Sequence, residues 1–155
     1  MEDIKYIQAT SEHVNILVDL RIIFSNEMSG KQDKEAEANL RENLTNYFTN
    51  EINKSYLCWF ATVNGEVSSI AGLGIRVQPG NYRNPSGIWG YIMSVYTLPQ
   101  HRKKGLSTNI LNRLVNSANE KGITSFELHS TKDGEPIYIK SGFVIHNEPT
   151  YRKFV

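Results

Sequence analysis

The dipeptide Asn64-Gly65, with the two runs beside it, constrains the fold more than any other feature of this sequence. The runs are residues 56–63 (YLCWFATV) and residues 67–77 (VSSIAGLGIRV), and both are rich in side chains that favour β-strands. Asn followed by Gly is the strongest short-range signal for a hairpin, because both residues tolerate a positive φ. The sequence therefore predicts an antiparallel pair of strands here.

A third run, residues 87–97 (GIWGYIMSVYT), is apolar almost without interruption. This character is typical of a central strand that is covered on both faces of its sheet. The loop before it, residues 78–87, contains Pro and Gly but is too short and too central to be a linker between domains. A chain of 155 residues, 39% of them hydrophobic, can bury one core without a metal or a disulfide. We expect a single domain over residues 1–155.

Helical patterns flank these runs. Thr10 or Ser11 can cap a first helix that ends near Gly30, and a second helix is predicted from about Asp33. The residues that recur along one side of the first helix are Val14, Leu17, Val18, Arg21 and Phe24. The second helix is polar on all but one side, so we expect it to lie on the surface.

The second half of the chain continues with alternating elements. An amphipathic helix is predicted between Gly105 and Gly122, and a brief helix covers residues 137–142. Further strands are expected at residues 3–9, 123–130, 143–147 and 151–155. The predicted fold class is therefore α/β (α+β), with a mixed, mostly antiparallel central sheet of about seven strands and helices on both faces.

Charge and composition exclude several kinds of partner. Seventeen basic and sixteen acidic side chains leave a net charge of +1, which gives no long-range attraction to nucleic acid or to an anionic membrane. No apolar run approaches the roughly 18 residues that span a bilayer. Cys58 is the only cysteine, the four histidines do not cluster, and the N-terminus lacks the pattern of a signal peptide. We expect a cytoplasmic protein with no nucleic-acid partner, no membrane partner and no metal.

Residues 96–111 (YTLPQHRKKGLSTNIL) form a junction between a strand and a helix. The chain breaks at Pro99, passes Arg102, Lys103 and Lys104, and enters the helix at Gly105. The first amides of a helix lack partners within it and lie at the positive end of its dipole, so they bind anions well. This pattern predicts a site for a phosphate-bearing small molecule. Local chemistry alone leaves open the alternative that the basic run is ordinary solvated surface.

Two common phosphate loops are excluded at this junction. A Walker loop needs a glycine five residues before Gly105, and that position is Gln100. A dinucleotide-binding loop needs three glycines, and this junction has one.

The remaining pattern, Arg102-x-x-Gly105-x-Ser107, resembles the acyl-CoA signature of the GCN5-related N-acetyltransferases (the GNAT family), which reads Gln or Arg-x-x-Gly-x-Gly or Ala. Ser107 departs from the usual last residue by one small hydroxyl. A second segment, residues 133–143 (DGEPIYIKSGF), is similar to the family's short helix that ends in Leu-Tyr-x-x-x-Gly-Phe. The two motifs stand in the family's order, and the resemblance extends over the whole chain.

The resemblance implies the acyl-CoA N-acyltransferase fold and an enzyme that moves the acetyl group of acetyl-CoA directly to the primary amine of a small molecule. It implies that the main chain of the central strand pairs with the pantetheine arm and that a gap between this strand and residues 123–130 admits the thioester. It also implies that Tyr138 is the general acid. The cofactor-binding residues that it implies are Val95, Tyr96, Thr97, Arg102, Lys103, Lys104, Gly105, Leu106, Ser107 and Thr108.

The general base is less evident, because many family members place Glu or Asp on the central strand and residues 87–97 contain no carboxylate. His129 could face the gap and accept a proton, because imidazole is a common general base, although a structural histidine at a strand end is an equal alternative. Tyr96 is a further polar candidate near the sulfur. Glu27, which follows the first helical pattern, could bind a cationic substrate or could simply be surface.

Three questions stay open at this stage. The acceptor could be a polyamine, an amino acid or an aminoglycoside-like amine. A catalytically weak acyl-CoA sensor or regulatory module is the alternative function, supported by the missing carboxylate. The final strands, at residues 143–147 and 151–155, could pair across a homodimer.

Overall fold

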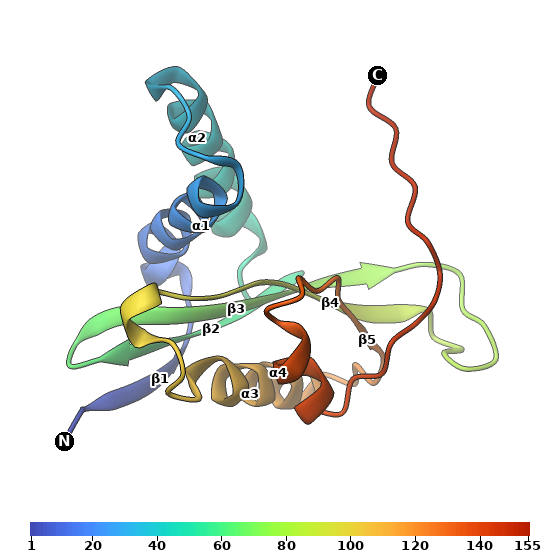
Figure 1. The fold of residues 1–155 in the computed structure, drawn as a ribbon. Helices are drawn as coiled ribbons and strands as arrows, with labels where there is room; N and C mark the ends of the chain where they lie inside the picture. Colours follow the sequence, from blue (N-terminus) through green and yellow to red (C-terminus); the bar gives the residue numbers. More distant parts are fainter.

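The computed structural model describes residues 1–155, and its sheet is a meander of four antiparallel strands with one parallel strand added at the edge (Figure 1). The strands are β1 (Ile4–Gln8), β2 (Tyr56–Val63), β3 (Glu66–Val77), β4 (Ile88–Thr97) and β5 (Phe126–Glu127). The order in the sheet follows the order in the chain, and only the β4–β5 pair is parallel. The predicted mixed, mostly antiparallel sheet is confirmed.

The predicted hairpin lies between β2 and β3. Asn64 has φ of 51° and Gly65 has φ of 85°, the two positive values that a tight hairpin turn with the right-handed twist requires. Val63 pairs with Glu66 directly beside this turn. The local turn chemistry therefore sets the register of the first two pairs, and a bulge then shifts the register by one residue from the Ala61–Ser69 pair onward.

Helices cover both faces of the sheet, as predicted. One face carries α1 (Val14–Ser29) and α2 (Lys34–Glu51), and the other carries α3 (Leu106–Glu120) and the short α4 (Glu135–Lys140) (Figure 1). Asp33 caps α2, because its side chain accepts a hydrogen bond of 2.8 Å from the amide of Ala36.

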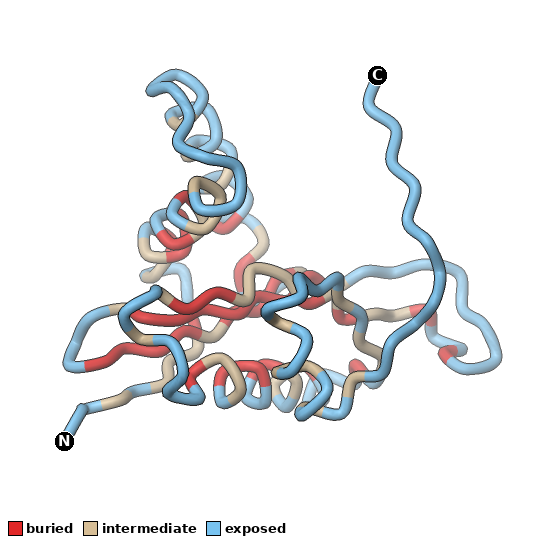
Figure 2. Tube along the Cα trace, in the orientation of Figure 1, coloured by how far each residue is buried: buried red, intermediate tan, exposed pale blue.

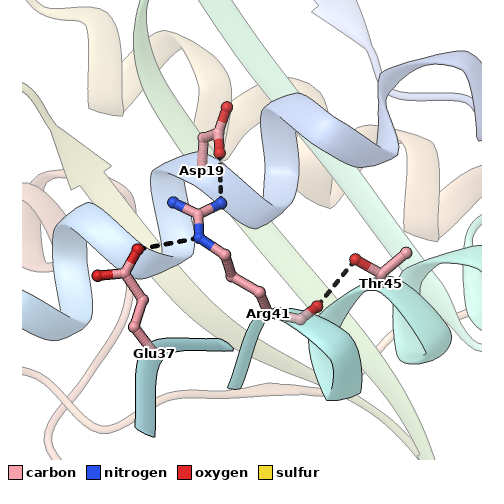
Figure 3. A network of polar contacts seen from close by, with 4 residues as sticks. All are labelled: Asp19, Glu37, Arg41 and Thr45. Atoms are coloured by element: carbon pink, nitrogen blue, oxygen red, sulfur yellow. Dashed lines mark hydrogen bonds and ion pairs between the residues drawn. The ribbon is translucent and has the colours of Figure 1, made fainter. Parts of the chain in front are cut away.

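An arginine joins the first two helices on their outer side. Arg41 of α2 donates to Asp19 of α1 at 2.7 Å and to Glu37, one turn earlier in α2, at 3.0 Å (Figure 3). Both ion pairs are partly solvated, so their combined contribution to stability is modest, about 1 kcal/mol or less for each. Only the pair with Asp19 links α2 to α1, because the pair with Glu37 lies within α2.

Two hydrophobic cores lie on opposite faces of the sheet, and Figure 2 shows the buried segments concentrated in the strands and in the helix faces turned toward them. The α1-side core contains Leu17, Val18, Leu20, Phe48, Tyr56, Phe60, Ile70 and Tyr96. The α3-side core contains Leu57, Leu73, Ile92, Leu106, Ile110, Leu111 and Leu114. β4 contributes to both cores, as expected for a central strand.

The prediction of about seven strands is wrong, because the sheet has five. The strand expected at residues 123–130 is reduced to the two residues of β5, and residues 143–155 contain no strand. An additional edge strand needs a neighbour with enough free backbone groups, and two paired residues offer too few. The last segment instead runs away from the sheet with Val144 and Tyr151 each 89% exposed (Figure 1). None of the four helices is long and apolar enough to cross a membrane.

Candidate active site

A bulge interrupts β4 near its end. Ile70 of β3 pairs with Tyr96 and Gly72 pairs with Met93, so β4 contains one residue more than β3 over this stretch. Ser94 lies in the bulge with a positive φ of 57°. The distortion directs the hydroxyl of Ser94 toward α1, where it accepts a hydrogen bond of 2.8 Å from Nη1 of Arg21. The regular ladder thus gives way at the point where β4 can meet a ligand.

The sheet opens on the other side of the same strand. Parallel pairing between β4 and β5 ends with Tyr91 opposite Glu127. From there to Thr97 the strand pairs only with β3, and its edge toward β5 has no strand partner. This edge offers main-chain N–H and C=O groups to an extended ligand. We call it the sheet opening.

The junction after β4 forms a cup of unpaired amides at the start of α3. The N–H groups of the six successive residues from Lys103 to Thr108 donate to no acceptor in the protein. Lys103 has φ of 63° and Gly105 has φ of 75°, left-handed values that turn successive amides toward one side. Together with the positive end of the α3 dipole, these amides make a concave group of donors suited to an anion, which we call the cradle.

The charged side chains around the cradle are partly engaged with carboxylates. Lys104 forms an ion pair with Glu2, and Arg102 donates to Glu27 at 2.9 Å and to the carbonyl oxygen of Thr97 at 2.9 Å. Lys103 forms no ion pair. The cradle therefore combines fixed backbone donors with three mobile cations that can turn toward an incoming phosphate.

A chain of hydroxyl groups links the cradle to the sheet. Ser107, in the first turn of α3, lies 2.7 Å from the hydroxyl of Thr97, which lies 2.7 Å from the buried hydroxyl of Ser69 on β3. Ser107 is the residue that departs from the usual signature of the family. In this chain its hydroxyl holds the beginning of α3 against the end of β4.

Glu27 connects α1 with the cradle. One of its carboxylate oxygens accepts from the phenol of Tyr96, and the other accepts from Arg102. These two hydrogen bonds, that from Tyr96 first, lower the pKa of Glu27. Burial, followed by the bond to Glu27, raises the pKa of Tyr96 to about 12, so this phenol keeps its proton at neutral pH. Both oxygens of Glu27 already have partners within the protein.

Tyr138 lies on α4, on the α3 side of the sheet. It packs against Phe143, with ring centroids 6.1 Å apart, and contributes to the α3-side core, as do Val95 and Leu128. Its side chain is half-buried, burial raises its pKa, and its hydroxyl has no hydrogen-bond partner in the protein. The phenol is therefore protonated and available to donate.

His129 lies two residues beyond the end of β5 and is exposed. Its ring is 5.7 Å from that of Tyr91. Continuing the β4–β5 register past Glu127 would bring His129 level with Met93, next to the bulge. The histidine is therefore beside the sheet opening but held by no hydrogen bond. No group of three His, Cys, Asp or Glu side chains is arranged to hold a metal ion.

The pair formed by Arg21 and Ser94 is not predicted from the sequence. The two residues are 73 positions apart, and nothing in either segment indicates that they touch. One signal was present, because Arg21 interrupts the apolar side of α1 between Leu17 and Phe24. An arginine inside an apolar stripe needs a partner or a ligand.

Comparisons with known proteins agree with this geometry. A family model described as an acetyltransferase (GNAT) domain matches residues 26–155. A predicted acetyltransferase from Clostridium acetobutylicum, solved with acetyl-CoA, is 30% identical, with 97% of this chain and 96% of that chain covered and a TM-score of 0.84. A search of curated proteins found no match.

Two more distant structures share the fold. Glucosamine-6-phosphate N-acetyltransferase from Arabidopsis thaliana is 14% identical, with 99% of each chain covered and a TM-score of 0.69. The aminoglycoside N-acetyltransferase AAC(6')-Iy, in complex with the bisubstrate analogue CoA-S-monomethyl-acetylneamine, is 15% identical, with 99% of each chain covered and a TM-score of 0.73. The match over residues 26–155 and the 30% identical relative establish that the chain belongs to the GNAT family of acetyltransferases and is an N-acetyltransferase.

Proposed function

We propose that this N-acetyltransferase takes its acetyl group from acetyl-CoA and transfers it to the primary amine of a small molecule. The six unpaired amides between Lys103 and Thr108 carry the proposal, because they form a phosphate site at the end of the strand whose edge is open. The relative from C. acetobutylicum that was solved with acetyl-CoA supports the choice of cofactor.

The cofactor is expected to bind along two features of the site. The cradle holds the pyrophosphate, and Arg102, Lys103 and Lys104 close over it. The pantetheine arm lies along the sheet opening and pairs with the main chain of Val95, Tyr96 and Thr97 as an added strand would. This arrangement brings the thioester next to the bulge, where an amide of β4 can stabilise the oxyanion.

The transfer then needs two proton movements. The neutral amine attacks the thioester carbonyl, the C–N bond forms, the C–S bond breaks and CoA leaves as a thiolate. Tyr138, protonated and without a hydrogen-bond partner, donates to the thiolate. His129, beside the opening, accepts a proton from the amine directly or through water. These roles are proposals for this chain.

Replacing Tyr138 with Phe tests the catalytic part. Removing a general acid should lower kcat by roughly 10²- to 10⁴-fold and leave the affinity for acetyl-CoA unchanged. Thiol release from acetyl-CoA, measured with a panel of small amines, gives the rate, and calorimetric titration gives the affinity.

Two results would count against the proposal. Unchanged turnover in Tyr138→Phe would remove the phenol from the mechanism. Tight binding of acetyl-CoA without thiol release for any small amine in the panel would contradict the choice of acceptor.

A further inference from the structure

Arg21 is a half-buried cation without a counter-ion. The chain has one other arginine with intermediate burial, Arg41, and that residue is paired with two carboxylates (Figure 3). The only side-chain acceptor of Arg21 is the neutral hydroxyl of Ser94, and no ion pair satisfies its charge. One N–H is used and four are left. A half-buried guanidinium with free N–H donors can therefore bind an anionic ligand.

The surroundings of Arg21 are apolar. A recess between α1, α2 and the sheet, too narrow to hold even a water molecule, is lined mainly by aliphatic and aromatic side chains, among them Leu17, Phe24 and Ile70. Arg21 supplies the only formal charge in this lining, and no carboxylate is part of it. The guanidinium also lies 5.6 Å from the ring of Phe24, which holds it at the edge of the recess. The recess thus combines apolar walls with one positive end.

Arg21 is also close to the expected reaction centre. Its partner Ser94 sits in the β4 bulge and directly precedes Val95, whose main chain is proposed to hold the thioester end of the cofactor. Consecutive Cα atoms are about 3.8 Å apart, so the residue that holds Arg21 is the direct neighbour of that position. The cofactor approaches from the sheet opening, whereas Arg21 comes from α1 on the other face. The acceptor amine is therefore expected on the side of Arg21.

We propose that the acceptor carries an oxyanion close to its amine and that Arg21, held by Ser94, binds this oxyanion. The inference rests on the proposed transfer to a small amine and narrows its substrate class. A guanidinium matches both carboxylate and phosphate through paired N–H donors. The absence of a carboxylate in the recess disfavours polycationic acceptors. Glu27, the nearest alternative for a cationic group, already binds Tyr96 and Arg102.

Matched acceptor pairs test the proposal. The carboxylate pair is L-leucine with 3-methylbutylamine, and the phosphate pair is phosphoethanolamine with ethanolamine, so each pair differs only in the oxyanion. Wild-type kcat/KM should favour the anionic member of at least one pair by roughly 10- to 100-fold, the value of one charge-assisted hydrogen-bonded contact. The pair with the larger ratio identifies the oxyanion.

Variants distinguish binding by Arg21 from a structural role. For the preferred pair, the ratio compares kcat/KM for the acceptor with the oxyanion to kcat/KM for the acceptor without it. In Arg21→Gln this ratio should fall to about 3 or less. Arg21→Lys should keep part of the preference, because the positive charge remains. Arg41→Gln breaks a comparable half-buried arginine of the neighbouring helix and should leave the ratio unchanged. Thermal unfolding of each variant reports any loss of stability separately from the ratio.

Three outcomes would overturn the inference or its foundation. The role of Arg21 would be overturned if the wild type showed no preference, or preferred the members that lack the oxyanion, in both pairs. An equal loss for all acceptors in Arg21→Gln would also overturn it. If Arg21→Gln kept the wild-type kcat/KM ratio within the preferred pair, the role of Arg21 would also be contradicted. Failure of the wild type to bind acetyl-CoA would instead contradict the proposed function, and calorimetric titration of acetyl-CoA is the measurement that separates the two cases.

Discussion

The two sides of β4 are built in different ways. On the cofactor side, the cradle depends on the backbone of one short segment, from Arg102 to Thr108, and its donors are amides. On the proposed acceptor side, the recess depends on side chains from α1, α2 and three strands, and its one charge is Arg21. Backbone donors suit a cofactor whose phosphates are always the same, whereas side chains can be exchanged to suit different acceptors. The glucosamine-6-phosphate and aminoglycoside acetyltransferases share this fold although their acceptors differ.

The largest expected effect is a loss of acetyl-CoA affinity caused by a change in the cradle alone. Gly105 has φ of 75°, and a Cβ built there would meet only the side chain of Asn109 at 3.8 Å, so a larger side chain would project toward the space of the anion. Gly105→Trp should weaken the binding of acetyl-CoA by roughly 100-fold or more, equivalent to losing two charge-assisted hydrogen bonds. Calorimetric titration measures this affinity.

The same helix supplies a matched control. Gly122 follows α3, has φ of 85° and has nothing within 4 Å of a built Cβ. Gly122→Trp therefore introduces the same backbone strain and the same side chain at the opposite end of α3. Its affinity for acetyl-CoA should match that of wild type, and an equal loss in both variants would contradict a local role for the cradle.

A smaller effect concerns Glu27, the carboxylate that connects the two sides. Glu27→Gln should lower the pKa of Tyr96 from about 12, because the bond to the carboxylate contributes to the rise, while burial keeps the pKa above the ordinary value of 10.0. Nuclear magnetic resonance of Tyr labelled at Cζ follows this titration. Glu37→Gln, whose carboxylate binds Arg41 instead, is the control. An unchanged titration of Tyr96 in Glu27→Gln would show that the connection is absent in solution.

The same titration has a consequence for stability. The folded protein holds the proton of Tyr96 more tightly than the unfolded chain does, because the folded pKa is the higher one. The free energy of unfolding should therefore fall as the pH rises from about 10 to about 12. Glu27→Gln should weaken this dependence, and denaturant unfolding at several pH values measures it.

The sequence was sufficient for features that are local. The hairpin at Asn64-Gly65 and the junction at Gly105 that begins α3 each depend on a few consecutive residues, whose conformational preferences act wherever the segment is placed. The contact between Arg21 and Ser94 depends on how α1 packs on β4, and no short-range rule contains that information. The arginine in the apolar stripe showed that a partner was needed but could not identify it.

The error in strand number has a similar origin. Residues 143–147 (FVIHN) and 151–155 (YRKFV) have the composition of strands, and composition is what a sequence pattern reports. Whether they pair depends on a neighbour, and β5 offers only Phe126 and Glu127. The catalytic roles of Tyr138 and His129 likewise depend on groups outside their own segments, and they stay predictions. The expected homodimer stays a prediction for the same reason.

The most direct test of the account follows backbone amide resonances of the wild-type protein during a titration with acetyl-CoA. The account predicts that the largest shifts fall on the six amides from Lys103 to Thr108, with smaller shifts along Val95 to Thr97. Saturable binding that leaves those six amides unperturbed would contradict the central claim that the cradle holds the pyrophosphate of the cofactor.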